Sequence, residues 1–349
     1  MFVAEDPIAF MVAVAFGLAV CVALPTAALT AVLVKLLMPL MRRYAMARPT
    51  ARGLHTTPTP QGGGLAIMLA IAVVCATLPM WLPHATPRDM PMLWRLLAAA
   101  SLLAALGALD DIYGLSARLR LVVQFFAVVL AWWGPWPFQA AQAGFYAPLL
   151  VGALASVGLV WFVNLTNFMD GMDGMTVVGL GVPALFAACA LVFTLDRGTD
   201  IAAFAAVGGL IGFFPFNKPR AALFLGDVGS LSLGLIVGVA FARLGLGGHP
   251  VAALIAPLYY LADATITLFL RWRRGENLAQ AHRSHFYQRA VTGGMSAWGV
   301  LARVGALNAA LAALASLALF EPDWRWQGAA LLAAVVLVGL TLRRLARGA

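Results

Sequence analysis

Charged residues are scarce in this sequence. Asp, Glu, Lys and Arg together make up 11% of its 349 residues, whereas hydrophobic residues make up 62%, and the mean hydropathy is +0.91. Average globular domains carry about 25% charged residues. The composition therefore excludes a soluble globular protein and predicts a polytopic membrane protein.

Cysteine is scarce as well. The three cysteines, Cys21, Cys75 and Cys189, all lie inside apolar runs. This placement gives neither a disulfide framework nor the spacing of a metal site, so we expect small packing residues. Sequence repeats and a separate soluble domain are also missing, and residues 1–349 are expected to form one multi-span domain.

Long apolar runs, by contrast, recur throughout the chain. A helix needs about 20 apolar residues to cross a membrane, and eleven runs are candidates, of which the fourth and the seventh are short. They begin near residues 8, 65, 92, 119, 146, 176, 200, 223, 250, 297 and 327. We therefore predict an all-α protein with about eleven transmembrane helices.

The basic residues are unevenly distributed over this topology. Seventeen Lys and Arg residues fall on one side of the membrane and four on the other. Because Lys and Arg are enriched in cytoplasmic loops, the first side is predicted to be cytoplasmic, with the N-terminus outside and the C-terminus inside. Five polar clusters all fall on that side, as an enzyme with a cytosolic substrate requires. They are His55 to Gly64, Asp110-Asp111, Asn164 to Gly174, Asn217 to Ser230 and Arg271 to Arg289.

The third cluster carries two amides and two carboxylates between long apolar runs. They are spaced three residues apart, which predicts that they share one side of a helical turn. Carboxylates at a membrane boundary are costly and favour a functional interpretation. The alternative is an interhelical turn rich in Asn, Asp and Gly. The four residues are Asn164, Asn167, Asp170 and Asp173.

Two further clusters add carboxylates. Asp110 and Asp111 end the third apolar run, and such a pair suits metal binding or proton abstraction, unless it is a solvated helix end neutralised by Arg118 or Arg120. Asp227 lies between two glycines at the start of another run. A carboxylate there suits a hard cation such as Mg²⁺, and the alternative is an ordinary helix N-cap.

The remaining clusters suit anions. Residues 55–64 combine prolines with three glycines, so backbone N–H groups can face an anion at a helix start. Residues 271–289 hold five arginines and two histidines, which suits phosphate groups. An ordinary positive loop accounts for the arginines at the start of this segment, but not for His282, Arg283 and His285.

In this order the five motifs resemble a known family over roughly residues 50–290. They are similar to those of the polyprenyl-phosphate N-acetylhexosamine-1-phosphate transferases. That family includes the phospho-MurNAc-pentapeptide translocase of peptidoglycan synthesis and the GlcNAc-1-phosphate transferases that begin O-antigen, enterobacterial common antigen and teichoic acid linkage. The resemblance implies transfer of a HexNAc-1-phosphate from a UDP-sugar to undecaprenyl phosphate in the bacterial inner membrane, with release of UMP.

The resemblance also implies roles for individual residues. Mg²⁺, with Mn²⁺ as the alternative, would neutralise the donor diphosphate while an acceptor phosphate oxygen attacks it. No nucleic acid is an expected partner, and a homodimer stays open. The metal candidates are Asp227 and Asn167, the catalytic candidates are Asp110, Asp111 and Asp170, and the substrate-binding candidates are Asn164, Asp173, Asn217, His282, Arg283 and His285.

Two departures from the family pattern bear on the substrate. Gln61 stands where relatives usually have Arg, and the final motif lacks three consecutive histidines. The second departure is typical of the O-antigen-initiating subgroup, whose donors include UDP-GlcNAc, UDP-FucNAc and UDP-QuiNAc. The alternatives are a peptidoglycan transferase, a transporter with carboxylates near the bilayer midplane, and a structural scaffold, which would not need the aspartates.

Overall fold

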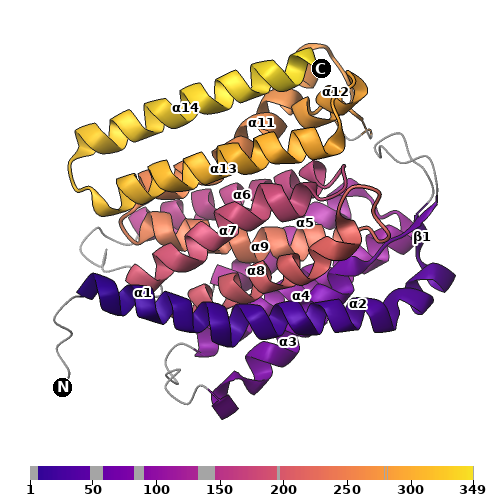
Figure 1. Ribbon diagram of the computed structural model, residues 1–349, viewed down its shortest axis with the longest axis horizontal. Helices are drawn as coiled ribbons and strands as arrows, with labels where there is room; N and C mark the ends of the chain where they lie inside the picture. The colour runs from indigo at the N-terminus through magenta and orange to yellow at the C-terminus, as the bar shows by residue number, and fades with distance from the viewer. Residues whose placement is uncertain are drawn as a thin grey trace.

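The helices run nearly parallel to one another through most of the molecule (Figure 1). This computed structural model describes residues 7–47, 58–81, 90–132, 146–194, 197–278, 280 and 282–348. The first part of the His55 to Gly64 cluster, including His55, lies outside the described residues. The long helices from the N-terminus are α1 (Pro7–Leu18), η1 (Ala19–Ala23), α2 (Leu24–Tyr44), α3 (Gly63–Trp81), α4 (Met90–Tyr113), α5 (Ala117–Trp132), α6 (Tyr146–Met169) and α7 (Met175–Phe193).

The second half of the chain continues in the same way. Its helices are α8 (Arg197–Asn217), α9 (Gly226–Leu246), α10 (Pro250–Ile255), α11 (Leu258–Arg273), α12 (Phe286–Thr292), α13 (Ala297–Phe320) and α14 (Trp324–Arg347). Two short strands, β1 (Met46–Ala47) and β2 (Thr59–Pro60), pair antiparallel. The all-α prediction holds apart from this two-residue ladder.

Within the described ranges, nine helices are long and apolar enough to cross a membrane. The protein is therefore a multi-pass membrane protein, but two of the eleven candidate spans do not reach that length. The fourth is α5, with 16 residues, and the ninth is interrupted between α10 and α11 at Ala256 and Pro257. The seventh was expected to be short, yet α8 runs for 21 residues because the helix continues through Pro215.

The polar clusters gather at one end of the bundle. In Figure 1 this end carries β1, α12 and the C-terminus, whereas α1 begins at the opposite end. The ends of α4 and α6, the start of α9 and the segment before α12 all contribute residues to it. We call it the polar end. Its carboxylates Asp110, Asp111, Asp170 and Asp227 thus lie at helix ends, not midway along a span as a transporter would require.

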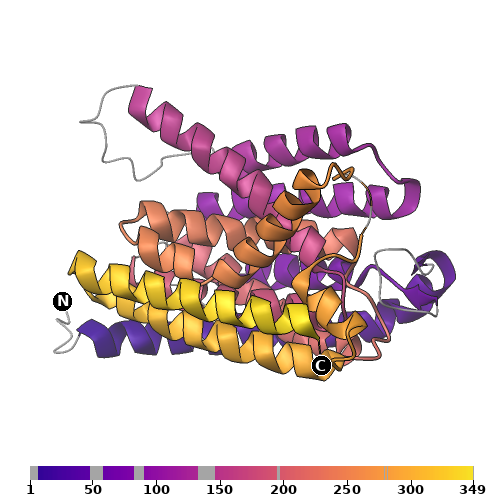
Figure 2. The same ribbon diagram turned by 90° about the horizontal axis from the view of Figure 1, so that it is seen from above.

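Helix α9 forms the centre of the bundle. It packs against α3, α4, α6, α7, α8 and α10, and 83% of its most apolar stretch is buried, compared with 28% for α14. A helix that is apolar on all sides is expected to be buried in this way. Figure 2 shows α5 (purple) and α14 (yellow) on opposite sides of the bundle.

Backbone hydrogen bonds next to the short ladder join two of the sequence clusters. Phe224 donates its N–H to the carbonyl of Pro60 at 2.9 Å, and Gly63 donates to the carbonyl of Phe224 at the same distance. Gly64 in turn donates to Leu225. The Pro- and Gly-rich segment therefore packs directly against the residues that precede Asp227, although more than one helix separates them in the chain.

Candidate active site

The aspartate of α9 meets the aspartate pair of α4 through a close contact between helix backbones. A Cβ atom at Gly107 would overlap the backbone of Asp227, so only glycine permits this distance. Asp227 donates its backbone N–H to Oδ2 of Asp111 at 3.1 Å. The carboxylate of Asp111 also interacts electrostatically with Asp110, Asp170 and Asp227. The structure thus brings four predicted carboxylates together.

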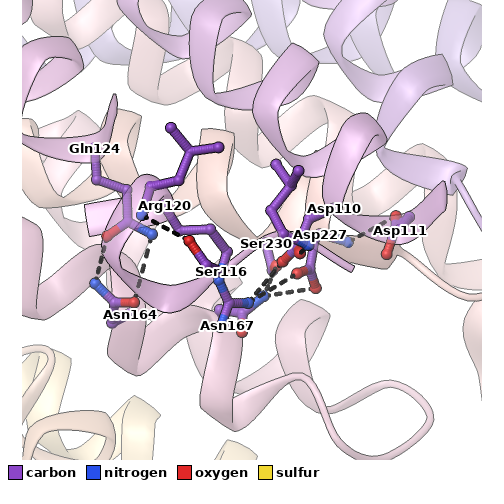
Figure 3. A network of polar contacts seen from close by, with 11 residues as sticks. Asp110, Asp111, Ser116, Arg120, Gln124, Asn164, Asn167, Asp227 and Ser230 are labelled. Atoms are coloured by element: carbon purple, nitrogen blue, oxygen red, sulfur yellow. Dashed lines mark hydrogen bonds and ion pairs between the residues drawn. The ribbon is translucent and has the colours of Figure 1, made fainter. Parts of the chain in front are cut away.

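Arg120 on α5 is a cation that contacts this group (Figure 3). Its Nη1 lies 2.6 Å from Oδ2 of Asp110 and 4.0 Å from Oδ2 of Asp227. The other oxygen of Asp110 accepts the N–H of Leu115 at 2.7 Å. Arg120 therefore neutralises Asp110, but the Asp110 side chain is 7% exposed and is not a solvated helix end. Asp111 faces the start of α9.

The two asparagines of α6 point to the same side of the helix, as their spacing predicts. Nδ2 of Asn167 donates to Asp227 at 2.7 Å and to Oγ of Ser230 at 2.9 Å. Asn164 and Gln124 exchange hydrogen bonds between their amide groups, with Asn164 donating at 2.6 Å (Figure 3). Asn167 thus joins the carboxylate group, and Asn164 lies one turn farther from it.

The expectation that all four residues share one side of a helical turn is wrong for Asp173, and Asp170 lies beyond the end of α6 although it stays near the carboxylate group. Helix α6 ends at Met169, and Gly174 adopts φ +71°, which turns the chain into α7. Asp170 accepts the hydroxyl of Thr176 at 2.5 Å. Asp173 turns away and accepts the N–H groups of Arg220 and Ala221 at 2.9 and 3.0 Å.

Asn217 also has structural partners. Its Oδ1 accepts the N–H of Gly174 at 2.9 Å, and its Nδ2 donates to the carbonyl of Leu223 at 3.0 Å. Arg220, between these contacts, is the only non-glycine residue with positive φ among those the structure describes. Asp173 and Asn217 therefore hold the α6–α7 turn against the α8–α9 loop, and their predicted role in substrate binding stays a prediction.

The histidine motif is fixed by a residue that the sequence analysis missed. Asp263 on α11 is fully buried, and its Oδ1 lies 3.3 Å from Nδ1 of His285. It also accepts the N–H groups of Phe286 and Tyr287 and the hydroxyl of Tyr259. Asp263 thus orients His285 and holds the first turn of α12. A lone acidic residue inside the apolar run of α11 was the signal that could have identified it.

Helix α12 is also tied to the central cluster. The hydroxyl of Tyr287 donates to the carbonyl of Phe168 at 3.4 Å, and a Cβ at Gly171 would overlap that hydroxyl. The ring of His282 lies 4.9 Å from that of His285. These contacts bring the histidines next to the end of α6, far from them in sequence.

A cavity of about 500 Å³ opens between α5, α6 and the histidines. We call it the α5–α6 cavity. Its polar wall comprises Arg120, Gln124, Asn164, Asn167, Gln280, His282 and His285. Its apolar wall includes Leu121, Val157 and Trp161, which are exposed on the outer surface of the bundle. One cavity thus joins a polar group to a lipid-facing surface.

A second cavity, of about 310 Å³, lies on the other side of the histidine loop. We call it the arginine cavity, and Arg283 lines this one and not the first. Its wall comprises Thr267, Leu270, Arg271, Arg274, Arg283, Ser284, Phe286 and Arg289. The structure therefore separates Arg283 from His282 and His285, with which the motif had grouped it.

Comparison with known proteins bears on this arrangement. The model of glycosyl transferase family 4 matches residues 93–245, which contain all four clustered carboxylates. The chain is 30% identical over 291 residues to the decaprenyl-phosphate N-acetylglucosaminephosphotransferase of Mycobacterium tuberculosis H37Rv, covering 73% of this chain and 71% of that protein. The chain belongs to glycosyl transferase family 4.

Other members of family 4 are similar at comparable levels. The undecaprenyl-phosphate alpha-N-acetylglucosaminyl 1-phosphate transferase of Escherichia coli K12 is 25% identical over 305 residues, covering 79% of this chain and 78% of that protein. The phospho-N-acetylmuramoyl-pentapeptide-transferase of Enterococcus faecalis V583 is 32% identical over 200 residues, covering 51% and 59%. The family resemblance of the five motifs is thereby confirmed.

The side chains of this family 4 site supply only part of the ligand set that a hard cation needs. Within the described residues, no three His, Cys, Asp or Glu side chains form a metal-binding group. Asp227 and the amide of Asn167 are adjacent, however, and both carry oxygen atoms. Mg²⁺ is commonly held by one or two carboxylates together with water and substrate phosphates. The residues present therefore fit an Mg²⁺ ion that shares its coordination with a phosphorylated substrate.

Proposed function

We propose that this protein transfers an N-acetylhexosamine-1-phosphate from a UDP-sugar to a polyprenyl phosphate and releases UMP. The observation that carries the proposal is the α5–α6 cavity, which joins Arg120, Asn167 and the two histidines to an apolar, outward-facing wall. A lipid phosphate has this same division into a charged head and an apolar chain. The names of the family 4 relatives, which are polyprenyl-phosphate GlcNAc-phosphate transferases, support the same reaction.

In this proposal the acceptor enters from the membrane. Its isoprenoid chain lies along Leu121, Val157 and Trp161, and its phosphate lies beside Arg120. An oxygen of that phosphate attacks the sugar-side phosphorus of the donor, and the bond between this phosphorus and the oxygen of UMP breaks. Arg120 already neutralises Asp110, so we assign the contact with the acceptor phosphate to Asp111.

The donor lies along the polar wall of the cavity, beside the histidines. Asp263 holds Nδ1 of His285, so the other ring nitrogen, Nε2, is assigned to the donor diphosphate together with His282. Asp227 and Asn167 would hold Mg²⁺, which when bound neutralises the diphosphate and favours departure of UMP. Asn164 lies on the same wall of the cavity and is assigned to the nucleoside side of the donor.

A donor panel tests the proposal. The purified protein, Mg²⁺ and undecaprenyl phosphate are combined with UDP-GlcNAc, UDP-FucNAc, UDP-QuiNAc or UDP-MurNAc-pentapeptide, and UMP is measured. We expect UMP only when polyprenyl phosphate and a UDP-HexNAc are both present, and we place the protein in the initiation of O-antigen or another envelope glycan. Preference for the pentapeptide donor would assign it to peptidoglycan synthesis, and no UMP from any donor would contradict the proposal.

The proposal also requires the polar end to face the cytoplasm, where UDP-sugars are found. This orientation follows from the seventeen-to-four distribution of Lys and Arg. Reporter domains fused after Arg347 and after Gly198 should give opposite signals, cytoplasmic for the first. Identical signals at the two positions would contradict the topology.

A further inference from the structure

The arginine cavity contains a buried cation with unused hydrogen-bonding capacity. Arg271 is 3% exposed. Its Nε donates to Glu276 at 2.7 Å, and its Nη2 donates to the carbonyl of Asn277 at 2.8 Å. Its Nη1 is buried and has no hydrogen-bond partner. A buried guanidinium N–H without an acceptor is costly, so this nitrogen indicates that the cavity receives an anionic ligand.

The charge around the cavity indicates the same ligand. Residues 258–292 contain five arginines and two acidic residues. Of the two acids, Asp263 is buried among its own hydrogen-bond donors, and Glu276 is shared between Arg271 and Arg274 at 2.7 and 3.7 Å. Four arginines line one cavity of about 310 Å³. Planar guanidinium groups in this density suit a phosphate ester.

The position of the cavity indicates where this phosphate comes from. Trp272 and Phe269, on the last turns of α11, are 64% and 51% exposed, and their rings lie 5.8 Å apart. Exposed aromatic side chains at the end of an apolar helix are typical of the membrane interface. Arg271 lies between these two residues in sequence, and Arg274 follows Trp272 by two residues. The cavity therefore lies at the level of the lipid headgroups.

The arginine cavity is also separate from the proposed reaction site. It shares no lining residue with the α5–α6 cavity. Residues of one loop alternate between the two, because His282 and His285 line the first while Arg283 and Ser284 line the second. A phosphate bound beside Arg271 thus lies behind the histidines and not among the reacting groups.

We propose that the arginine cavity binds the phosphodiester headgroup of an anionic phospholipid. Basic pockets between transmembrane helices on the cytoplasmic side are suited to such headgroups. Arg271, Arg274 and Arg289 hold the phosphate, and the acyl chains extend past Phe269 and Trp272. Because Phe286 lies in the same wall and follows His285 directly, a bound headgroup steadies the histidine loop from behind.

The test measures lipid binding and not turnover, so its failure is distinct from failure of the proposed function. The full-length protein is purified, delipidated and titrated with phosphatidylglycerol or phosphatidylcholine, and bound lipid is counted by native mass spectrometry. The test variant combines Arg274→Gln and Arg289→Gln, whose side chains are exposed, so the fold is retained. Arg271 is left intact because its hydrogen bonds hold residues 276 and 277.

The control variant removes the same charge outside the cavity. It combines Arg273→Gln and Arg343→Gln, two exposed residues that do not line it. We expect selective binding of phosphatidylglycerol by the wild type and the control, and affinity weakened at least about tenfold in the test variant, since hydrogen bonds to charged groups are lost. Equal loss in the control, equal binding of both lipids, or displacement of the lipid by millimolar inorganic phosphate would overturn the proposal.

Discussion

The two cavities at the polar end differ in how their charge is balanced, although one short loop separates them. The α5–α6 cavity is lined by a single arginine, Arg120, which pairs with Asp110 beside the cavity and lies 4.0 Å from Asp227. The arginine cavity is lined by four arginines, of which Arg271 and Arg274 share Glu276. The positive charge at the α5–α6 cavity is therefore balanced by neighbouring carboxylates, which suits the exchange of phosphorylated substrates. The arginine cavity carries excess positive charge, which suits retention of an anion.

The largest effect is expected where the α5–α6 cavity meets the carboxylate group. Asp227→Asn should lower kcat for UMP release by about a hundredfold or more, because an amide is a poorer ligand for Mg²⁺ and the loss of metal-based charge stabilisation amounts to several kcal/mol. Excess Mg²⁺ should restore part of the activity. Asp323→Asn, at the half-buried N-cap of α14, is the control, and wild-type turnover in the Asp227 variant would remove the metal assignment.

A smaller effect is expected behind the histidines. Asp263→Asn removes one acceptor from His285 and from the first turn of α12, which should lower kcat/KM for the UDP-sugar about ten- to hundredfold. KM for the polyprenyl phosphate should not change. The matched control is Asp200→Asn, which alters another fully buried carboxylate at the start of α8. If both variants lost activity equally, the effect would be one of folding.

Arg283 offers a direct comparison of the two cavities. Its sequence motif predicts a contact with the UDP-sugar donor, whereas its side chain lines the arginine cavity. Arg283→Ala should lower kcat/KM for the UDP-sugar by about tenfold or more, and Arg283→Lys should recover only part, because Lys lacks the planar fork. Measurements in neutral and in anionic bilayers should give the same ratio to wild type. A defect confined to anionic bilayers would assign Arg283 to the lipid instead, and Arg273→Ala provides the control.

The smallest effect concerns Glu276. Its hydrogen bond from Arg271 lowers the pKa of the carboxyl below its usual value of 4.5, so the ionised form stabilises the folded protein above that pH. This stabilisation is lost as the pH falls through the lowered pKa. Glu276→Gln should therefore reduce Tm slightly at pH 7, and the two proteins should converge in acid. The variant should also bind phosphatidylglycerol more tightly, and weaker binding would contradict the charge balance described above.

The sequence predicted the parts of this structure that depend on local pattern. Apolar runs located the helices, and steps of three placed Asn164 and Asn167 on one side of α6. The same spacing gave a wrong position for Asp173, because α6 ends at Met169. No local sequence pattern shows in which direction the chain turns after the helix, at Gly174. The division of His285 and Arg283 between two cavities depends on α12 docking against Phe168, a contact 119 residues away in sequence.

The length criterion for spans failed for a related reason. The sequence around Pro257 is apolar throughout, so it predicts one span where the structure has α10 and α11. Asp263 lies just after this break, where its carboxylate meets Tyr259 and the N-terminus of α12. An acid in an apolar run was visible in the sequence, but its partners His285, Phe286 and Tyr287 lie beyond the end of the helix and could not be inferred from spacing.

The pairing of the Pro- and Gly-rich segment with the residues before α9 has a consequence for how substrates enter. Pro60, Gly63 and Gly64 exchange backbone hydrogen bonds with Phe224 and Leu225, so this side of the site and the central helix behave as one rigid floor. In the proposed reaction two substrates of very different shape enter the site and two products leave it. Any movement that admits them is therefore expected outside these paired segments.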